Sequence, residues 1–524
     1  MANKQLFQTR PGAVLPVAMA RNAAQAPAYA LDAKHKLAQL AATGCLGGTF
    51  YADAAEQLGT VLALTHEVDA AFVARAAVYA RERGHMKDMP ALLMASLATR
   101  NTDLLVKVFP RVIDNGKMLR NFVQIVRSGV VGRKSLGTRP KKLVQRWLCT
   151  ATEKQLLHAA VGNAPSLADV VKMVHPKPAE AWRAAWFAWL LGKPFDEAAL
   201  PRITRAFEHY KLNTSRRLVD EVVEVPFQML TAKAPSPAQW TQIALAGSWQ
   251  MVRQGLNTFA RHGVFAHSDI ARAVAKKLAD PQALKSARAM PYQLLAAYRA
   301  AGPGVPGVVR EALNRAMELS LANVPTLKGN VVVCPDVSGS MASSITGFRG
   351  SATSSVRCID VAALLSAAVL RKNPRARVLP FEQRVVEIAL NARRTVMANA
   401  QALAEIGGGG TDCSAPLALL NKERARVDLV ILVSDNQSWV GAHQFSPTRT
   451  IQEWEALKLN NPGARLVCID IQPYGTTQAP ERRDILNVGG FSDAVFGLVA
   501  AFAAGRMDAR HWVGEIENLS LEAH

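Results

Sequence analysis

The chain has 524 residues, enough for two or three domains, and its 49% hydrophobic and 20% charged residues exclude a largely disordered protein. The net charge is +21, yet residues 331–524 carry 19 basic and 19 acidic side chains, so the whole excess lies in residues 1–330. We therefore expect two parts with different tasks. The basic part should favour a polyanion, with nucleic acid ahead of an anionic membrane surface.

Several classes of protein are disfavoured by the sequence. No stretch of 18 apolar residues is free of charges, so we expect no membrane-spanning helix. The first residues, MANKQLFQTRPG, lack the apolar core of a secretory signal, and we expect a cytoplasmic protein. The six cysteines are scattered without a CxxC pair, which argues against a disulfide framework or a structural zinc site. We interpret them as buried reduced thiols.

The first part of the chain has a helical pattern. From about residue 28 to residue 322 the apolar residues recur with helical spacing, as in residues 90–100, 102–114 and 269–280. Short breaks containing Gly, Pro, Asn or Ser separate these segments. A run of short helices over about 300 residues exceeds the needs of one bundle core, so we predict stacked helical hairpins, an all-α HEAT-like solenoid. Because no clean sequence period is present, this prediction rests on the succession of helices.

The pattern changes at Val324-Pro325, and we predict a helical domain in residues 1–325 and an α/β domain in residues 326–524. Strands alternating with helices predict a doubly wound parallel sheet, in which ligands bind at the carboxyl ends of the strands. The predicted strands are 329–334, 376–381, 384–390, 427–434 and 464–471. The predicted helices are 358–371, 395–406, 417–426 and 451–460, and residues 493–505 are predicted to begin extended and end helical.

Polar loops follow three of these predicted elements. They contain an Asp-x-Ser-x-Ser sequence at 336–340, a glycine run before Thr411-Asp412, and Ser434-Asp435-Asn436. If the strands are parallel, these loops lie at one edge of the sheet. A set of oxygen ligands with two carboxylates suits a hard divalent cation, and we expect Mg²⁺, with Mn²⁺ and Ca²⁺ as alternatives. The expected ligands are Asp336, Ser338, Ser340, Thr411 and Asp435.

Two other interpretations of these loops compete with a metal site. Asp-x-Ser-x-Ser alone is a common turn composition, and GGGGT resembles a phosphate cradle. However, no GK[ST] follows the glycines and no GxGxxG opens a helix after the first strand, which disfavours nucleotide binding. The order of the three loops favours the metal site. With two carboxylates the ion would keep residual positive charge, so an open coordination position would attract a carboxylate or phosphate from a partner.

The α/β part resembles a von Willebrand factor A domain with its metal-ion-dependent adhesion site, whose pattern is D-x-S-x-S, then Thr, then Asp. In that family the two serines and the threonine can ligate directly, and the last aspartate often acts through water. Longer sequence segments in this part resemble the Ro autoantigen family, whose bacterial members are called Rsr. These segments are PDVSGSM (335–341), GGGGTDCSAPL (407–417), VILVSDNQSW (430–439) and RRDILNVGGFSDAV (482–495).

The Ro resemblance covers nearly the whole chain and is most specific in the last 200 residues. It implies an N-terminal TROVE domain, a closed ring of HEAT-like helices, joined to the A domain. It implies a ribonucleoprotein that holds a small noncoding Y RNA on its outside. It also implies that the hole accepts single-stranded 3′ ends of misfolded or damaged RNA. In bacteria the implied partner is a 3′-to-5′ exoribonuclease, polynucleotide phosphorylase, tethered through Y RNA for RNA quality control. We expect a monomer.

The densest basic segment is residues 101–150, with 11 basic and 2 acidic side chains. Pro140 suits the first turn of a helix that places Leu143, Val144, Trp147 and Leu148 on one face and Lys141, Lys142, Gln145 and Arg146 on the other. A solvated helix face is the ordinary alternative. We favour a polyanion site because the preceding loop adds three more basic residues with no acid nearby in the sequence. The expected RNA contacts here are Arg133, Lys134, Arg139, Lys141, Lys142 and Arg146.

Residues 166–178 (SLADVVKMVHPKP) resemble a TROVE segment in which a His-x-Lys-Pro end helps to bind Y RNA, and Lys172, His175 and Lys177 are the matching positions. The family has a Lys/Arg pair upstream of that histidine, whereas this chain has LLHAAVG at 156–162. His175 before a proline also fits the C-terminal residue of a helix. Further candidate phosphate contacts are Arg216, Arg217, Arg253, Arg261 and His262, whereas Trp147 and Trp249 are expected in the core.

No carboxylate cluster suited to two-metal nuclease chemistry and no nucleophile–base pair is visible in the sequence, so we expect a protein that is not an enzyme. The main alternative to RNA binding is a metal-dependent protein-interaction adaptor whose helical half is a scaffold. A metal-dependent RNase is a second alternative. An adaptor has no need for positive charge confined to its helical half, so the charge distribution favours RNA binding.

Overall fold

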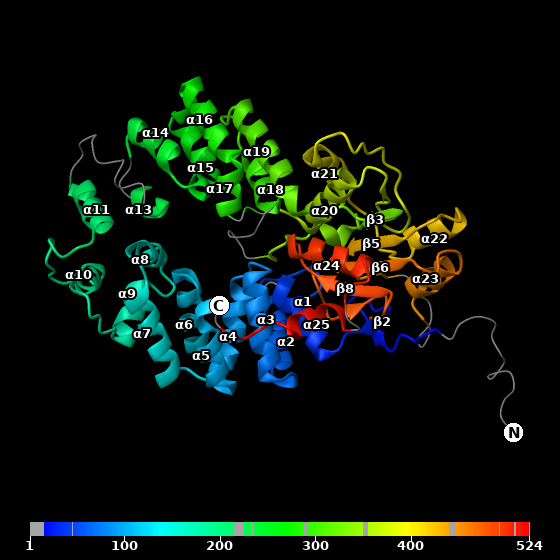
Figure 1. The fold of residues 1–524 in the computed structure, drawn as a ribbon, viewed down its shortest axis with the longest axis horizontal. Helices are drawn as coiled ribbons and strands as arrows, with labels where there is room; N and C mark the ends of the chain where they lie inside the picture. The colour runs from blue at the N-terminus through cyan, green and yellow to red at the C-terminus, as the bar shows by residue number, and fades with distance from the viewer. Residues whose placement is uncertain are drawn as a thin grey trace.

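The computed structural model describes residues 15–43, 46–212, 225–231, 235–287, 289, 291–348, 355–439, 447–491, 493–507 and 510–522. Its first part is helical and its second part is an α/β domain, as predicted (Figure 1). None of the described helices has the length and apolar character needed to cross a membrane.

Short helices follow one another through the first part of the chain. Several begin at a capping box. The side chain of the residue before the helix, such as Asp53, Thr152 or Ser166, accepts a hydrogen bond from the backbone N–H three residues later, and the side chain of that later residue accepts one from the backbone of the first. The helices are α1 (Ala33–Thr43), α2 (Ala54–Glu67), α3 (Ala70–Glu82), α4 (Asp88–Arg100), α5 (Thr102–Val112), α6 (Gly116–Ser128), α7 (Thr138–Thr150), α8 (Glu153–Ala160), α9 (Leu167–Val174), α10 (Ala181–Leu190), α11 (Arg202–Leu212), α13 (Phe227–Thr231), α14 (Pro237–Ala246), α15 (Trp249–Arg261), α16 (Ser268–Leu278), α17 (Pro281–Ser286), α18 (Pro291–Ala300) and α19 (Gly307–Ser320).

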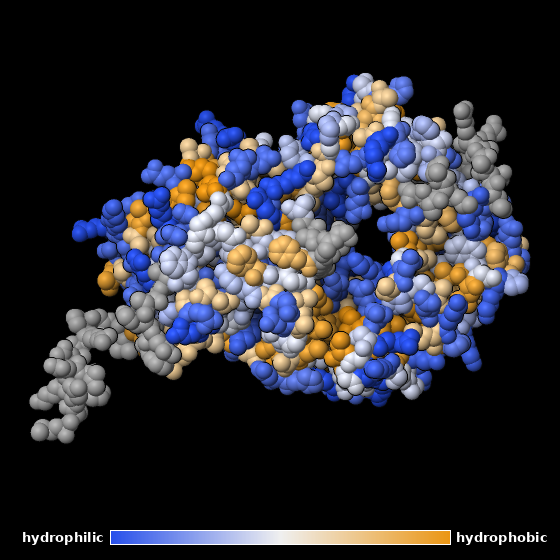
Figure 2. All heavy atoms as spheres, turned by 180° about the vertical axis from the view of Figure 1, so that it is seen from behind, coloured by the Kyte–Doolittle hydropathy of each residue, from blue (hydrophilic) through white to orange (hydrophobic). Residues whose placement is uncertain are grey.

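These helices form a ring. In the first arm α3 packs on α4 and α5, α4 on α6, and α5 on α7, so that each helix covers the apolar stripe of near neighbours. In the second arm α14 packs on α15, and α16 and α18 pack on α19. Figure 1 shows the two arms, in blue to cyan and in green, meeting the α/β domain at opposite ends of the helical run. The space-filling view shows an opening through this part of the molecule (Figure 2).

In the described part of the α/β domain five strands form one parallel sheet in the order β4-β3-β5-β6-β8. Every residue of β3 and β5 is buried, and alternate residues enter two different cores: Val331 and Val333 face one, Val332 and Cys334 the other. The strands are β3 (Val331–Pro335), β4 (Arg377–Val378), β5 (Leu429–Ser434), β6 (Arg465–Asp470) and β8 (Ile485–Gly489). The helices are α20 (Cys358–Lys372), α21 (Val396–Ala404), α22 (Ala415–Lys422), α23 (Arg449–Asn460), α24 (Asp493–Ala503) and α25 (His511–Glu517).

Two predicted strand segments were wrong. Residues 384–390 lie outside the sheet because the chain turns back after β4: Glu382 N donates to Arg384 O at 2.9 Å, and Val386 N donates to Pro380 O at 2.8 Å. Residues 493–505 do not begin extended, since α24 starts at Asp493. An apolar run of this kind fits a buried helix as well as a buried strand, and the spacing alone did not separate them.

Other elements were missed or displaced. The predicted helix 417–426 begins at Ala415 and ends at Lys422, with Pro416 in its first turn. Strand β8 was not predicted, nor was the small antiparallel sheet β1-β2-β7. Its strands are β1 (Ala20–Arg21), β2 (Pro27–Ala30) and β7 (Thr476–Thr477).

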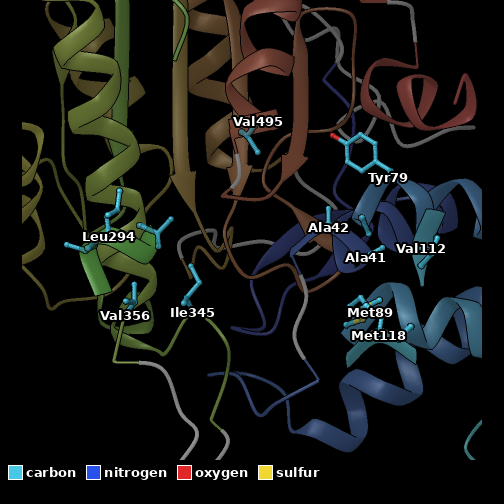
Figure 3. Packing of buried hydrophobic residues seen from close by; sticks show 14 of the residues in the cluster. Ala41, Ala42, Tyr79, Met89, Val112, Met118, Leu294, Ile345, Val356 and Val495 are labelled. Atoms are coloured by element: carbon cyan, nitrogen blue, oxygen red, sulfur yellow. The ribbon is translucent and has the colours of Figure 1, made fainter. Parts of the chain in front are cut away.

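The α/β domain closes the ring at two junctions. At the first, β2 pairs with β7, α1 packs on β8 and α25, and Lys34 of α1 forms an ion pair with Glu517 at 2.6 Å. At the second, α18 packs on α20 and α19 on α21, and Arg299 forms an ion pair with Asp360 at 2.6 Å. One hydrophobic core runs through both junctions. Figure 3 shows Ala41 and Ala42 of α1 and Leu294 of α18 in the same cluster as Val356 and Val495 of the α/β domain.

Candidate functional site

The predicted metal loops meet at the carboxyl edge of the sheet. Asp336 follows β3 and Asp435 follows β5, the neighbouring strand, and Asp336 N donates to Val433 O at 2.9 Å. The glycine loop approaches them closely: Gly339 N donates to Gly409 O and Gly408 N donates to Val337 O, both at 3.0 Å. Gly408 has φ 135°, a backbone conformation that favours glycine. The loop that carries Thr411 is therefore held against the Asp-x-Ser-x-Ser loop.

The expected ligands are buried together. Asp336, Ser338, Ser340, Thr411 and Asp435 are each at most 6% exposed. The Ser338 and Ser340 hydroxyls are 3.3 Å apart. Asp336 Oδ1 accepts from Ser338 N at 2.8 Å, and Asp336 Oδ2 accepts from Ser434 Oγ at 2.6 Å. Ser434 was not among the predicted ligands, although it belongs to the predicted Ser434-Asp435-Asn436 loop.

The electrostatics of this cluster fit a cation. Burial and the neighbouring charge of Asp435 raise the pKa of Asp336 to about 7, against hydrogen bonds from Ser338 and Ser434 that lower it. Burial also raises the pKa of Asp435. These two carboxylates are thus costly to ionise in the protein alone, and a divalent cation would remove that cost. Among the described residues no group of three or more His, Cys, Asp or Glu has metal-binding geometry, so an ion here needs the hydroxyls as ligands too.

A third carboxylate, Asp470, ends β6 at the same edge and pairs in register with Ser434. It is 1% exposed, and neither of its carboxylate oxygens has a hydrogen-bond partner within the described part of the chain. Burial, followed by the charge of Asp435, raises the pKa of Asp470 well above its usual value. Asp470 lies near the end of the predicted strand 464–471, and no role was predicted for it.

The basic helix is α7, and its two faces are as predicted. Leu143, Val144 and Leu148 are buried and Trp147 packs against the core at its edge. On one side of α7, a groove is lined by Arg127, Lys134, Lys141 and Lys142 together with Gln145 and Met173. Arg127 comes from the end of α6 and was not among the predicted residues.

A second groove lies on the other side of α7 and is lined by Arg139, Lys142 and Arg146 with Asp103 and Val106. Lys142 lines both grooves. Arg139 also forms an ion pair with Asp103, which offsets part of its charge. Arg133 differs from the rest: its Nη1 donates to Ala98 O at 3.0 Å and it is half-buried, so it anchors the loop before α7.

The TROVE-like segment lies beside the first groove. Gln145 Nε2 of α7 donates to Val174 O at 2.6 Å, which ties α7 to the end of α9. His175 is the residue that ends α9, with φ 52°, and its side chain is exposed. Lys172 and Lys177 are exposed as well. The structure therefore brings two separately predicted basic segments next to each other. We call the two grooves beside α7 and the exposed residues at the end of α9 the α7–α9 surface, which comprises Arg127, Lys134, Arg139, Lys141, Lys142, Arg146, Lys172, His175 and Lys177.

Comparison with known proteins agrees with this architecture. Residues 330–503 match the family model of the Ro60 vWA domain. The RNA-binding protein RO60 of Deinococcus radiodurans is 26% identical over 519 residues, which cover 93% of this chain and 96% of that protein. The crystal structure of Deinococcus radiodurans RO (RSR) protein matches with a TM-score of 0.64 and 23% identity, over 91% of this chain and 100% of that chain. The resemblance to the Ro family is confirmed. The RNA-binding protein RO60 of Caenorhabditis elegans is 24% identical over 246 residues, 45% of this chain and 37% of that protein.

Among the remaining candidate phosphate contacts of this Ro-like chain, Arg253 and His262 make contacts within the protein. Arg253 donates to Gln293 O at 3.0 Å and to the Gln250 side chain, so it links α15 to α18. His262 stacks on Trp240 with ring centroids 4.6 Å apart. Trp249 is buried, as expected, and its indole donates to Leu278 O at 3.0 Å. Arg261 is exposed, and Arg216 and Arg217 lie outside the described residues.

Proposed function

We propose that this chain is an RNA-binding protein and that the α7–α9 surface is its main contact for the RNA backbone. The observation that carries the proposal is the first groove, where four basic side chains from α6, the following loop and α7 line one concave surface. Such a surface suits phosphates in an irregular or single-stranded backbone. Two relatives of this chain carry the name RNA-binding protein RO60, which supports the same class of ligand.

The finer proposal follows the resemblance to Ro proteins. The chain holds a Y RNA or Y-like noncoding RNA, and its ring accepts the single-stranded 3′ end of a misfolded RNA. The opening in Figure 2 supports the second part, because a single strand is narrower than a duplex. Cleavage is left to a partner, the exoribonuclease polynucleotide phosphorylase. In this proposal the chain acts in the cytoplasm as a monomer, without catalysis of its own.

We further propose that Asp336, Ser338, Ser340, Thr411 and Asp435 hold one Mg²⁺, with Mn²⁺ or Ca²⁺ as substitutes. The support is the burial of two carboxylates among hydroxyl oxygens. When bound, the ion would supply positive charge at the edge of the sheet. The residues of this chain hold it, and they orient the loops around it.

The test of RNA binding removes charge from α7. The triple variant Lys141→Ala, Lys142→Ala, Arg146→Ala leaves the buried face of the helix intact. If all three residues contact phosphates, the slope of log affinity against log salt should fall in magnitude by about 2, roughly 0.7 for each contact with a single strand. The matched control is Arg272→Ala, Lys276→Ala, Lys285→Ala, which removes the same charge from exposed positions of α16 and α17.

Filter binding at several salt concentrations measures both variants. A weaker affinity and flatter slope in the α7 variant, with the control close to wild type, supports the proposal. An equal loss in both variants would show that only the overall charge matters. Failure of the wild-type chain to bind RNA would contradict the proposal and favour the protein-interaction adaptor.

A further inference from the structure

A row of polar residues crosses the sheet beside the metal loops. Asp336 follows β3, and its backbone N donates to Val433 O of β5 at 2.9 Å. Ser434, the last residue of β5, pairs in register with Asp470, the last residue of β6, and Ile471 N donates to Ser434 O at 3.0 Å. Starting from Asp336, the row therefore reaches Ser434 on the next strand and Asp470 on the strand after that.

The three side chains lie on one face of the sheet. Leu432 of β5 and Cys468 of β6 belong to the same hydrophobic core, and Ser434 and Asp470 each come two residues later, on the same side of their strands. On this face Ser434 Oγ donates to Asp336 Oδ2 at 2.6 Å. Because neighbouring strands are about 4.8 Å apart, the backbones that carry the two aspartates are about 10 Å apart.

The Asp470 carboxylate is left without a partner in this row. The single hydrogen of the Ser434 hydroxyl goes to Asp336, and the same oxygen accepts from Asn436 N at 3.0 Å. Asp470 and Asn436 are each 1% exposed, and among the described residues neither the two carboxylate oxygens nor the two side-chain amide atoms have a hydrogen-bond partner. Burial of such groups is costly, so they call for an ion or ordered water nearby.

The end of β6 also adjoins the segment that follows the Asp-x-Ser-x-Ser sequence. Two residues after Asp470, Gln472 Nε2 lies 3.5 Å from Ser344 O. The preceding residue, Ser343, donates from its backbone N to Ser340 O at 3.1 Å. Within the ranges that the structure describes, the buried Ser343 hydroxyl has no partner either. Unpartnered polar atoms thus come from three segments around the metal loops.

We propose that Asp470 is an outer carboxylate of the cation site, acting on the ion held by Asp336 and Asp435 through its charge and through ordered water. A direct ligand role does not fit, because no three acidic side chains of the described chain converge as metal ligands. Two carboxylates match the charge of a divalent ion and a third exceeds it, so the loaded site would attract a partner's carboxylate or phosphate less strongly. This inference rests on the proposed metal site and is independent of RNA binding.

The charge of the ion sets the expected effect of removing Asp470. Groups outside the direct ligands of a metal typically contribute 10- to 100-fold to its affinity. At a fixed distance the attraction of a carboxylate for an ion is proportional to the charge of the ion. If Asp470→Asn weakens Mg²⁺ binding about 10-fold, it should therefore weaken binding of the trivalent ion Tb³⁺ about 30-fold. A variant that only disturbs the loops would weaken both ions by a similar factor.

The test uses the full-length, metal-free chain without RNA. Isothermal titration calorimetry measures Mg²⁺ and Tb³⁺ binding to wild type and to Asp470→Asn, which keeps the shape of the side chain. The matched control is Asp428→Asn, at an exposed position that precedes β5, about 20 Å along the strand from the metal loops. We expect the control to bind both ions as wild type does. Asp336→Ala serves as the variant without a site.

Circular dichroism and thermal melting show which variants are folded. If Asp470→Asn is not folded, Asp470→Ser removes the same charge with a smaller side chain and takes its place. The rise in melting temperature on addition of Mg²⁺ gives a second readout, and it should be smaller in the Asp470 variant than in wild type.

Four outcomes would overturn the inference. Equal Mg²⁺ affinity in wild type and the Asp470 variant removes the role of Asp470 and leaves the metal site standing. An equal loss for Mg²⁺ and Tb³⁺ shows an effect on loop structure rather than on charge. Failure of wild type to bind Tb³⁺ while it binds Mg²⁺ contradicts a site with a third carboxylate. Absence of binding of either ion by wild type removes the metal site, and the role of Asp470 with it.

Discussion

The Arg299 guanidinium of α18 and the fully buried Asp360 carboxylate of α20 meet at 2.6 Å across the second junction. Asp360 also accepts from Arg357, at 2.8 Å from the backbone N and at 2.8 Å from Nη2. One carboxylate thus joins the last helices of the ring to the start of a helix in the α/β domain. The Asp360 side chain is 0% exposed and that of Arg299 is 27% exposed, so solvent and salt screen this ion pair less than a pair at the surface.

Removal of the shared carboxylate should destabilise the protein strongly. In Asp360→Ala both arginines lose their partner, and we expect a loss of about 3 kcal/mol in the free energy of unfolding. Arg299→Ala should cost less, about 1–2 kcal/mol, because Arg357 still neutralises Asp360. The control is Arg377→Ala, which breaks an exposed pair with Glu423 and should cost less than about 1 kcal/mol. Urea denaturation gives all three values, and equal losses in the three variants would contradict this ranking.

The metal site and the α7–α9 surface should respond separately to substitution. Asp336→Ala removes one of the two buried carboxylates of the expected metal site and should abolish Mg²⁺ binding in calorimetry. Its RNA affinity should stay at the wild-type value, since the basic grooves lie on α6, α7 and α9. Normal Mg²⁺ binding by this variant would show that the assigned ligands are wrong. Loss of RNA binding by a folded Asp336→Ala chain would show that the two sites are not independent.

Stability should depend on pH through Glu481 at the first junction. Burial raises the pKa of Glu481 to about 8, with a contribution from Asp32 and against hydrogen bonds from Asn487. The folded chain therefore binds the proton more tightly than the unfolded chain, whose pKa is near 4.5. The contribution of Glu481 to the free energy of unfolding is therefore largest below pH 4.5, and it falls as the pH rises from 4.5 to about 8.

Glu481→Gln should remove that dependence, because glutamine resembles the protonated side chain. We expect the variant to be close to wild type in stability near pH 5 and to exceed it by a growing margin as the pH rises to 9. Urea midpoints at pH 5, 7 and 9 measure the difference, with Glu387→Gln at an exposed position as the control. A constant difference between Glu481→Gln and wild type across this range would refute the assignment.

The strands that are buried on both faces were the ones best predicted from the sequence. β3, β5 and β6 are continuous apolar runs because helices cover both sides of the sheet, and the loops after β3 and β5 could be placed from that alone. The strands that were missed are short or have no such run. β1 and β7 have two residues each, and a strand so short carries no alternation to detect.

Site residues were predicted only where a local sequence pattern places them. Asp336 and Asp435 come directly after predicted strands, and the basic residues of α7 recur with the period of a helix. How α1 docks on β8, and so which loops of the helical part meet the α/β domain, is encoded by no local pattern. Arg127 was missed for the same reason, since it joins the α7 groove through the packing of neighbouring helices rather than through its place in the basic segment.

The opening of the ring should favour RNAs that carry a free single-stranded end. A structured RNA with a free single-stranded 3′ tail should bind more tightly than the same RNA with a blunt end. The physical reason is that a single strand can enter an opening between helices, whereas a duplex is broader and stays on the surface. The α7–α9 surface should contribute similarly to both RNAs, so the advantage of the tail should survive in the Lys141→Ala, Lys142→Ala, Arg146→Ala variant even though both affinities fall. Filter binding of both RNAs to wild type and to this variant, at one salt concentration, measures the two effects together. Equal affinity of wild type for tailed and blunt RNA would refute entry of the tail, and loss of the tail's advantage in the variant would place the tail on the α7–α9 surface instead.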